Sequence, residues 1–376
     1  MSLLVCLYTI TSRILDSPSN IFFRLMDPDN LMAGVEFMLV GIFIIVLAIY
    51  AQLARKKRIY KNLTKVKRNL EQWISNIILE ETEESMQVPP KFKRVVQQKW
   101  ARQFVIDGLV DAKRNLSGTV ADNITQLYLQ LDLKKDSLVK LRSTSWHVKA
   151  RGIQELYLMD QIDLLKTIYK NTNNRNEFVR MESQIGVIYM TGFAGLRFLD
   201  VISYPLTEWQ QIKLIEQLKR SGKPEDISTN INNWLSSTND TVVIFALKLA
   251  GEYQQFASRN QIVNTLVHPN EMVRTQGIKT LVQLADQQTP YVLLGYFRKE
   301  ASANRLLILD ALATLATAEQ TTILTALLND EDNIIKLKAA IALANASPEG
   351  MEILEQKAAQ EKEPFERILM HVKSVA

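Results

Sequence analysis

The chain has 376 residues, of which 47% are apolar and 23% are charged. This composition is ordinary for folded proteins and excludes wholesale disorder. The single cysteine, Cys6, excludes an internal disulfide framework and a multi-cysteine zinc site, and the three histidines, His147, His268 and His371, lie too far apart to form a metal-ligand motif. We therefore expect no cofactor and no metal ion; a metal site built from carboxylates alone is left open, but no motif in the sequence indicates one.

The net charge of +5 is concentrated near the N-terminus. Residues 1–68 contain ten Lys or Arg and four Asp or Glu, so residues 69–376 contain 35 basic and 36 acidic residues. A protein body that binds nucleic acid usually carries an excess of basic side chains over its own surface. The balanced charge of the larger part therefore argues against nucleic acid as a partner.

The first element that the sequence predicts is an apolar helix at residues 31–54. Phe37 to Ala51 is an unbroken apolar run, with Glu36 before it and Gln52 after it. A helix of this length spans about 36 Å, whereas the hydrocarbon core of a bilayer is about 30 Å thick. A buried helix of a soluble core, the alternative, would usually show a polar stripe, which this run lacks. We predict a transmembrane helix whose Glu36 reaches the headgroup layer; a proton-relay role for Glu36 is left open.

The flanks of this helix predict its orientation. It is followed directly by Arg55, Lys56, Lys57 and Arg58, whereas residues 1–30 carry two arginines and three aspartates. The positive-inside rule then makes residues 1–30 a short extracytoplasmic segment and places the bulk of the chain in the cytoplasm, as a single-pass protein of the plasma (inner) membrane. The run lacks the basic n-region of a cleaved signal peptide. Whether residues 3–10 contact the outer interface is left open.

Residues 55–90 are predicted to form a basic juxtamembrane helix and then a linker. Apolar residues recur there at intervals of three and four, as in Leu63, Val66 and Leu70, which is the period of a helix. The cations of this helix would lie among anionic headgroups or act only as a stop-transfer signal. The acidic run EETEES and the prolines at 89–90 then break the helix. Residues 91–134 are expected to form a helical N-terminal cap or a divergent repeat.

From about residue 135 the sequence repeats with a period of about 31 residues. The equivalent positions, which we call anchors, are Val148, Val179, Gln210, Val242, Val273, Asn304 and Ile335. Three residues before the anchors stand Ser145, Asn176, Thr207, Asn239, Asn270, Ala301 and Asp332. Six of these seven are residue types that cap the N-terminus of a helix, so the pattern predicts that a helix begins directly after each of them.

Two further positions of the repeat are apolar. Eight residues after the anchors stand Leu156, Val187, Leu218, Ala250, Leu281, Leu312 and Leu343, and five residues after them six of the seven are apolar, with Gln184 as the exception. These two positions share one face of a helix. A shorter apolar helix precedes each cap, so each unit is a helix, a turn and a longer helix. Stacked units of this kind bury their apolar faces against one another as an α-solenoid.

This pattern resembles the HEAT-repeat family over about residues 135–347. The family places an Asp or Asn cap in the turn and then a Val-Arg or Val-Lys pair. Val-Arg appears here in the units that begin with Asn176 and Asn270, and the unit that begins with Asp332 has the similar pair Ile335-Lys336. The resemblance implies an all-α superhelix, with residues 348–376 as C-terminal capping helices. Gln211 and Val243 stand where the basic residue is expected, and these units indicate a bend, a binding insertion or repeat decay.

The candidate binding residues are the basic residues that follow the anchors: Lys149, Arg180, Arg274, Arg305 and Lys336. With one per repeat, they form a ladder that binds an acidic partner or, as the resemblance implies, ties each turn to the next through hydrogen bonds. The stretch YMTGFAGLRF at 189–198 lacks the spacing of a phosphate loop, so we interpret Gly192 as a helix C-cap. We identify no catalytic residue and expect no small-molecule substrate.

Repeat solenoids commonly bind proteins. The sequence therefore predicts a membrane-tethered cytoplasmic scaffold or adaptor, not an enzyme, that contacts the bilayer through residues 31–54 and positions a membrane-associated protein partner. An envelope or polysaccharide-synthesis assembly is suggested by family analogy alone. Two alternatives remain. Some HEAT-like proteins resemble bilin lyases, which suggests an enzyme that acts on a bound cofactor or pigment, and a solenoid can also bind nucleic acid. The single cysteine and few histidines argue against the first, and the balanced charge argues against the second.

Overall fold

The computed structural model describes residues 28–79, 88, 90–222 and 227–375, and the statements below refer to these residues. Over this part of the chain the secondary structure is helical, without a strand. The chain divides into two compact units, residues 1–133 and residues 134–376. Most of the predicted extracytoplasmic segment, including residues 3–10, and most of the linker at 80–90 lie outside the described residues.

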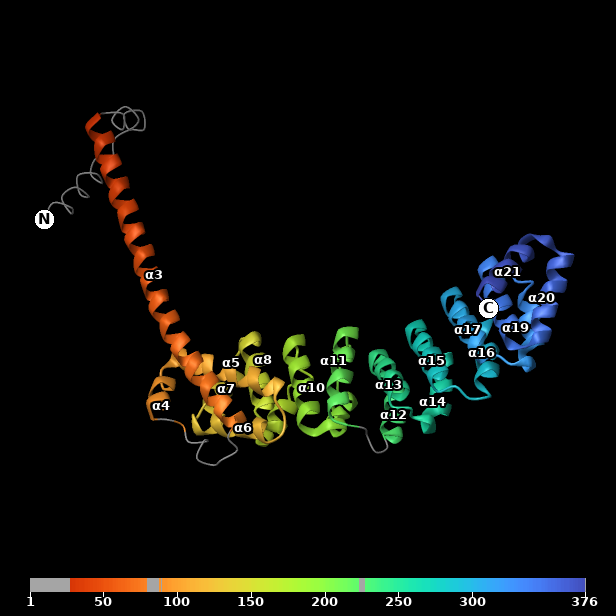
Figure 1. Cartoon of the computed structure of the whole chain (residues 1–376), viewed down its shortest axis with the longest axis horizontal. Helices are drawn as coiled ribbons and strands as arrows, with labels where there is room; N and C mark the ends of the chain where they lie inside the picture. The colour runs from red at the N-terminus through yellow and green to blue at the C-terminus, as the bar shows by residue number, and fades with distance from the viewer. Residues whose placement is uncertain (1–27, 80–87, 89, 223–226, 376) are drawn as a thin grey trace. The chain divides into compact units, whose positions relative to one another are not determined.

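The first unit contains one very long helix, α3 (Pro28–Leu79), and three shorter ones, α4 (Pro90–Val96), α5 (Lys99–Asn115) and α6 (Thr119–Gln130). The predicted apolar helix and the predicted juxtamembrane helix are therefore one continuous element (Figure 1). Near its C-terminal end α3 packs against α4, α5 and α6, and Val66 and Leu70 are almost fully buried. A Cβ atom at Gly108 of α5 would lie 2.6 Å from Leu70 Cδ2, so the two helices approach closely there.

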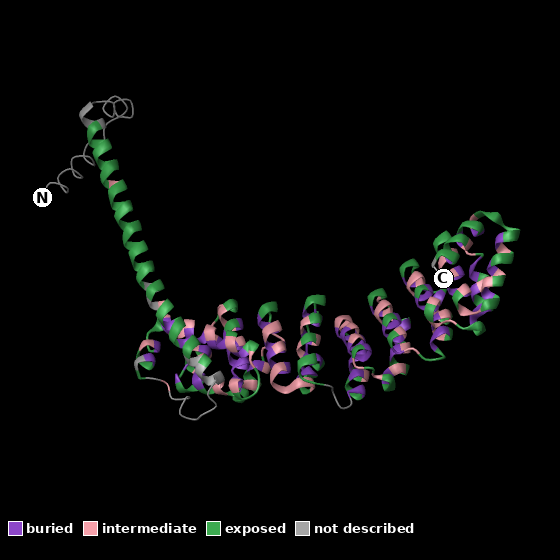
Figure 2. Ribbon diagram, viewed as in Figure 1, coloured by how far each residue is buried: buried purple, intermediate pink, exposed green. Residues whose placement is uncertain are grey.

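The other end of α3 has a different environment. Fifteen large apolar side chains between Met32 and Leu53 are more than half exposed, and Figure 2 shows this stretch as exposed almost along its whole length. Within α3, Met32–Gln72 is the helix of the described residues that is long and apolar enough to cross a membrane, and its most apolar 18-residue window has a mean hydropathy of 2.6 with none of it buried.

The second unit is a series of helix pairs that lie side by side (Figure 1). The first helices of the pairs are α7 (Lys134–Leu141), α9 (Leu165–Tyr169), the 3-10 helix η3 (Gly192–Asp200), α12 (Ser228–Leu235), α14 (Arg259–Asn264), α16 (Thr289–Phe297) and α18 (Thr321–Leu327). The second helices are α8 (Trp146–Leu158), α10 (Glu177–Thr191), α11 (Glu208–Arg220), α13 (Asp240–Glu252), α15 (Glu271–Gln283), α17 (Ser302–Leu315) and α19 (Asn333–Ala346). Two more helices, α20 (Pro348–Gln360) and α21 (Lys362–Val375), follow the last pair.

All seven second helices begin two residues before an anchor, so the predicted N-caps are confirmed as the residues that precede them. In five of the seven the side chain accepts a hydrogen bond from the first turn, and Thr207 also forms a capping box with Gln210. Ser145 and Ala301 are the exceptions, because neither side chain makes a capping hydrogen bond. The local register of the repeat thus follows from hydrogen bonding at the start of each helix.

The predicted apolar positions form the core of the second unit. The seven residues that lie eight positions after the anchors are at most 2% exposed. Five positions after the anchors, Ile215 is only partly buried, while the polar exception Gln184 is buried and donates from Nε2 to the carbonyl oxygen of Thr172. One cluster of buried apolar residues runs from Ile188 to Val372, so neighbouring pairs share a continuous core.

Packing between the helices depends on close approaches and on polar links. A Cβ atom at Gly152 of α8 would lie 2.6 Å from the backbone nitrogen of Leu141 in α7, so only glycine allows this approach. Between the third and fourth pairs the Leu206 backbone N–H donates to Thr241 Oγ1 at 2.8 Å, and Trp234 Nε1 donates to Asp200 Oδ1 at 2.7 Å. These bonds link the third pair, whose sequence departs most from the repeat, to the fourth.

Candidate functional site

Two of the predicted ladder residues, Arg180 and Arg274, hold the turns that precede their own helices. Arg180 Nη1 donates to the carbonyl oxygens of Asn174 and Arg175 at 2.8 and 3.0 Å. Arg274 Nη1 donates to the carbonyl oxygens of His268 and Pro269 at 2.9 and 3.2 Å. Both guanidinium groups therefore satisfy backbone acceptors of a tight turn that no helix ladder reaches.

Two ladder arginines also connect one helix pair to the next. Arg274 Nε donates to Glu300 Oε1 at 2.9 Å, and the Glu300 side chain is only 2% exposed. Arg305 Nη2 donates to Asp330 Oδ2 at 2.7 Å. Hydrogen bonds of this charged kind are stronger than neutral ones, and a buried carboxylate such as Glu300 requires its partner.

The remaining predicted cations differ from the arginines. Lys336 Nζ lies 3.4 Å from Asn333 Oδ1 in the same helix, and within the described part of the chain no hydrogen bond or ion pair joins the side chain of Lys149 to a neighbour. The five residues therefore occupy one repeat position, but they do not form a uniform row of free cations. The four topology residues, Arg55 to Arg58, lie together on α3 directly after its apolar stretch, and all four are exposed.

In the third and fourth pairs the residue after the anchor is not basic, and the two residues that stand there have different environments. Gln211 Nε2 donates to the carbonyl oxygen of Leu206 at 3.2 Å, which is the turn carbonyl five residues earlier that Arg180 and Arg274 reach in their own units. Val243 is fully buried instead. Sequence comparison of the repeats places Gln211 at the arginine position, so this role was detectable from the spacing.

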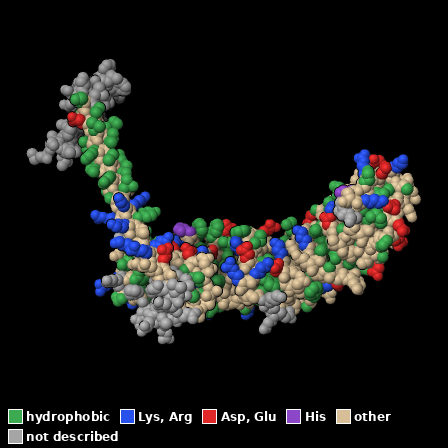
Figure 3. All heavy atoms as spheres, viewed as in Figure 1, with side chains coloured by type: hydrophobic (Ala, Val, Ile, Leu, Met, Phe, Trp, Pro, Cys, Tyr) green, Lys and Arg blue, Asp and Glu red, His purple; other side chains and the backbone are tan. Residues whose placement is uncertain are grey.

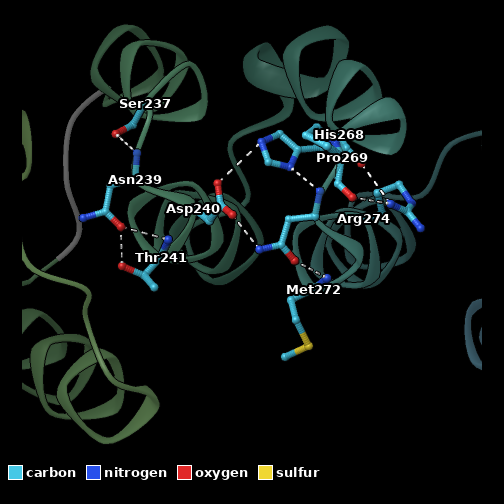
Figure 4. A network of polar contacts seen from close by, with 9 residues as sticks. Ser237, Asn239, Asp240, Thr241, His268, Pro269, Met272 and Arg274 are labelled. Carbon is cyan, nitrogen blue, oxygen red and sulfur yellow. Dashed lines mark hydrogen bonds and ion pairs between the residues drawn. The ribbon is translucent and has the colours of Figure 1, made fainter.

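A polar network connects the turn of the fourth pair to that of the fifth (Figure 4). Asn270 Nδ2 donates to Asp240 Oδ2 at 2.6 Å, and His268 Nε2 lies 3.8 Å from Asp240 Oδ1. The Asn270 backbone N–H donates to His268 Nδ1, and Asn270 Oδ1 accepts from the backbone N–H of Met272. The side chain of Met272 points away from this network in Figure 4.

Met272 belongs to a row of exposed apolar side chains that the sequence analysis missed. Phe178, Trp209, Met272 and Ile334 each occupy the second residue of a second helix, and Trp146 occupies the first residue of α8. Their exposed fractions are 46% for Trp146, 45% for Phe178, 59% for Trp209 and Met272, and 53% for Ile334. We call these five residues the apolar edge. For four of them the signal that would have found them is the residue directly before the anchor, whereas Trp146 lies two residues before Val148.

Contacts within the apolar edge are aromatic. The rings of Trp146 and Phe178 stack with centroids 4.8 Å apart, although they come from different pairs. Lys213 Nζ lies 4.7 Å from the centroid of the Trp209 ring and is also bonded to Glu216 at 2.8 Å. Figure 3 shows hydrophobic side chains among acidic and basic ones along the margin of the second unit over α8, α10 and α11.

Carboxylates stand next to the apolar edge. The first residues of α10, α11, α13 and α15 are Glu177, Glu208, Asp240 and Glu271. Acidic residues are favoured there by the positive end of the helix dipole. Asp240 is used by the network described above. Glu177, Glu208 and Glu271 are exposed and make no side-chain hydrogen bond or ion pair within the described residues.

Gly192, Lys248 and the acidic side chains bear on whether the chain holds a phosphate, a catalytic base or a metal ion. Gly192 is the C-cap of α10 with a φ of 60°, as predicted. Burial, with the charge of Lys279 adding to it and that of Glu208 opposing it, lowers the pKa of Lys248 below its ordinary value. Within the residues that the structure describes, no group of three or more His, Cys, Asp or Glu side chains is arranged to hold a metal ion.

Comparison with known proteins finds no matching family model and no matching curated protein. Solved structures do match. An engineered protein is 12% identical over 81% of this chain and 98% of its own, with a TM-score of 0.38. The complex of CpcE and CpcF of phycocyanin lyase from Nostoc sp. PCC7120 is 12% identical over 77% of this chain and 96% of its own, with a TM-score of 0.23. A structure on tubulin recruitment by microtubule polymerases with tumor overexpressed gene domain arrays is 12% identical over 72% and 70%, with a TM-score of 0.24. At these TM-scores none of the matches assigns a function to this chain.

Proposed function

We propose that this protein is a membrane-anchored scaffold, in which α3 crosses the bilayer and the second unit binds a protein partner through the apolar edge. The observation that carries the proposal is that four of the seven repeats expose a large apolar side chain directly before the anchor, and that Trp146 of the first pair stacks on one of them. Single exposed apolar residues are common on soluble proteins. Several of them grouped along one edge of a repeat array are instead typical of an interaction surface.

The anchoring part of the proposal is supported by the exposure of α3. Burying one large apolar side chain is worth about 1.5–3 kcal/mol, so fifteen such side chains exposed to water on one helix would be strongly unfavourable. A bilayer removes this cost. The exposed cations at Arg55 to Arg58 directly follow the apolar stretch and support an orientation with the second unit in the cytoplasm.

The binding part is supported by the residue types. Tryptophan, phenylalanine and methionine are enriched at the centres of protein interfaces, where they contribute a large share of the binding energy. Trp146, Phe178 and Trp209 come from three successive pairs, so one partner segment can contact all of them. The turns that precede Phe178 and Trp209 are held in place by capping bonds and by Arg180 and Gln211, which reduces the cost of ordering the surface on binding.

The orientation can be tested with the native cysteine as a probe. In intact cells that express the full-length chain, we expect Cys6 to react with a membrane-impermeant maleimide added outside. A Cys6→Ser variant that carries Lys362→Cys should react only after permeabilisation. The opposite pattern would refute the orientation, and equal labelling of both sites in a soluble fraction would refute anchoring.

Partner binding can be tested by site-specific photo-crosslinking in the same cells. A benzophenone amino acid at Trp209 or Met272 is expected to crosslink one shared species. The same group at Phe256 is the control, because Phe256 is 56% exposed but lies before α14, outside the apolar edge. Crosslinks from Phe256 alone, or unrelated products from Trp209 and Met272, would contradict binding along this edge.

A further inference from the structure

We propose that the partner of the apolar edge is a polypeptide segment that carries basic side chains among large apolar ones. This inference rests on the proposed function and adds the chemistry of the partner. It is based on the charged side chains that lie beside the apolar edge, on which of them form hydrogen bonds or ion pairs within the protein, and on the regular spacing of the repeats.

Three of the four central repeats, pairs two, three and five, present an exposed carboxylate beside an exposed apolar side chain. Glu177 precedes Phe178, Glu208 precedes Trp209, and Glu271 precedes Met272 at the starts of α10, α11 and α15. All six side chains are exposed. Since the pairs recur at the same repeat position, a partner that covers the apolar residues must also approach the carboxylates.

Few basic side chains lie in the same turns, and the two nearby ladder arginines are bonded to other groups of the protein. In residues 173–178, 203–209, 236–241 and 268–272, which form the turns of pairs two to five, the charged side chains are four carboxylates and Arg175. The guanidinium of Arg180 is bonded to turn carbonyls and lies 4.3 Å from the ring centroid of Tyr204. Arg274 is bonded to the buried Glu300. These two arginines are therefore not available to an acidic partner. Lys213, which lies over the Trp209 ring, is paired with Glu216, and Lys248, which interacts with Glu208, is partly buried, so the turns themselves present an excess of carboxylates.

The loss of water around the carboxylates on binding determines that the partner should be basic rather than acidic. A partner that covers Phe178 and Trp209 removes water from Glu177 and Glu208, and a carboxylate that loses water without a counter-charge weakens binding. Basic side chains on the partner restore the lost interaction, while acidic ones add repulsion. The apolar contacts thus provide most of the affinity, and the carboxylates select the charge of the partner.

The spacing matches an extended segment. Equivalent helices of neighbouring pairs pack about 8–10 Å apart, and an extended chain advances about 3.3 Å per residue. One partner residue in three can therefore reach successive repeats, and roughly nine residues would span pairs two to five. A segment with apolar and basic side chains at this interval fits the edge.

The experiment is a selection from a displayed library of random 16-residue peptides, with full-length protein in detergent micelles as bait. We expect the wild-type protein to enrich peptides with more Lys and Arg and more large apolar residues than the unselected library. Binding of a selected peptide, measured by fluorescence anisotropy at physiological salt, should weaken tenfold or more in the Phe178→Ser, Trp209→Ser double variant. It should weaken about threefold to tenfold when Glu177, Glu208 and Glu271 are all replaced by Gln.

The matched control replaces Glu349, Glu352 and Glu366 by Gln, because these exposed carboxylates lie on α20 and α21 and the net charge changes equally. This control should leave binding unchanged, and circular dichroism should show unaltered folding of every variant. Edge-dependent selection of neutral or acidic peptides, or equal effects of the two Gln triples, would overturn the inference and leave the proposed function standing. Selection that is unaffected by the Phe178→Ser, Trp209→Ser variant, or that yields no peptide, would overturn both.

Discussion

At the scale of single residues, a few polar side chains decide whether the turns between helices are stable. Arg274 is the clearest case, because it bonds two turn carbonyls of its own pair and the buried carboxylate of Glu300 in the next. Asn304 Nδ2 also donates to Glu300, so the carboxylate keeps one neutral partner if the arginine is lost. A neutral partner compensates a buried charge only in part.

We expect Arg274→Ala to lower the free energy of unfolding by about 3 kcal/mol, because it leaves Glu300 buried without its counter-charge. Denaturant unfolding of the full-length protein followed by circular dichroism measures this change. Arg298→Ala is the control, since Arg298 is exposed, and it should change the free energy by less than about 0.5 kcal/mol. Equal effects of the two substitutions would show that the Arg274 bonds contribute little to stability.

A second residue-scale prediction concerns the cap that α17 lacks. Ala301 has the extended backbone of an N-cap, with φ −63° and ψ 157°, but no side-chain acceptor. Ala301→Ser should therefore stabilise the protein by about 0.5–1 kcal/mol. Ala303→Ser adds the same hydroxyl at an exposed position inside the helix and should give no such gain. Thermal unfolding of the two variants compares them directly, and the cap interpretation fails if Ala303→Ser stabilises as much.

At the scale of helices, the distance between partners is set by small residues as well as by the apolar face. Gly152 lets α8 approach the backbone of α7, whereas Gly295 in α16 has no heavy atom within 4 Å of the position of an added Cβ. Glycine therefore has a different role at each of these two positions. In the first helix pair it is required by packing, and in α16 it only adds conformational freedom to the unfolded chain.

These two glycines should respond in opposite directions to the same substitution. Gly152→Ala is expected to destabilise the protein by about 1–3 kcal/mol, because the new methyl group meets backbone atoms that cannot move away easily. Gly295→Ala should stabilise it by about 0.5–1 kcal/mol. The midpoints of thermal unfolding report both changes. A loss of stability in Gly295→Ala would show that α16 has a neighbour that this structure does not contain.

At the scale of the whole molecule, the two compact units differ in how far their apolar side chains are buried. The second unit buries one continuous apolar cluster, as expected for a solenoid in which each repeat packs on its neighbours. The first unit buries Val66 and Leu70 but leaves the apolar stretch of α3 exposed. This stretch therefore requires a cover that the described residues do not supply, and a bilayer is the cover that we propose.

Charges in the middle of this stretch should release the protein from membranes. Ile42→Arg with Ile45→Arg places two cations where the bilayer would be deepest, at a cost of about 2.5–3.5 kcal/mol each. We expect the variant to leave the carbonate-washed membrane fraction, while Ile42→Leu with Ile45→Leu remains in it. Both side chains are exposed in the structure, so the thermal unfolding of the second unit should not change. Loss of folding in the Arg variant alone would indicate a buried helix instead.

Much of the fold was predictable because its signals are local. Cap residues such as Asn176 and Asn270, the 31-residue spacing and the apolar positions at Leu156 or Leu343 lie within one or two turns of the helix that they specify. The candidate site was predicted less well. The ladder arginines were found, but the spacing alone left open whether they face a partner or their own turns, and the exposed neighbours Phe178 and Trp209 were missed.

The sequence by itself determined where each second helix begins and which of its faces is buried, since capping and helical period depend on nearby residues. Tertiary structure alone decided that Arg274 is paired with Glu300 and that Trp146 stacks on Phe178. It also decided that α3 packs against α5 and α6 with Val66 and Leu70 buried, while Met32 to Leu53 stay exposed. The physical reason is that burial and pairing depend on which surfaces neighbouring elements cover. The residue type beside an anchor does not show whether a neighbouring element buries that side chain or leaves it exposed to a partner.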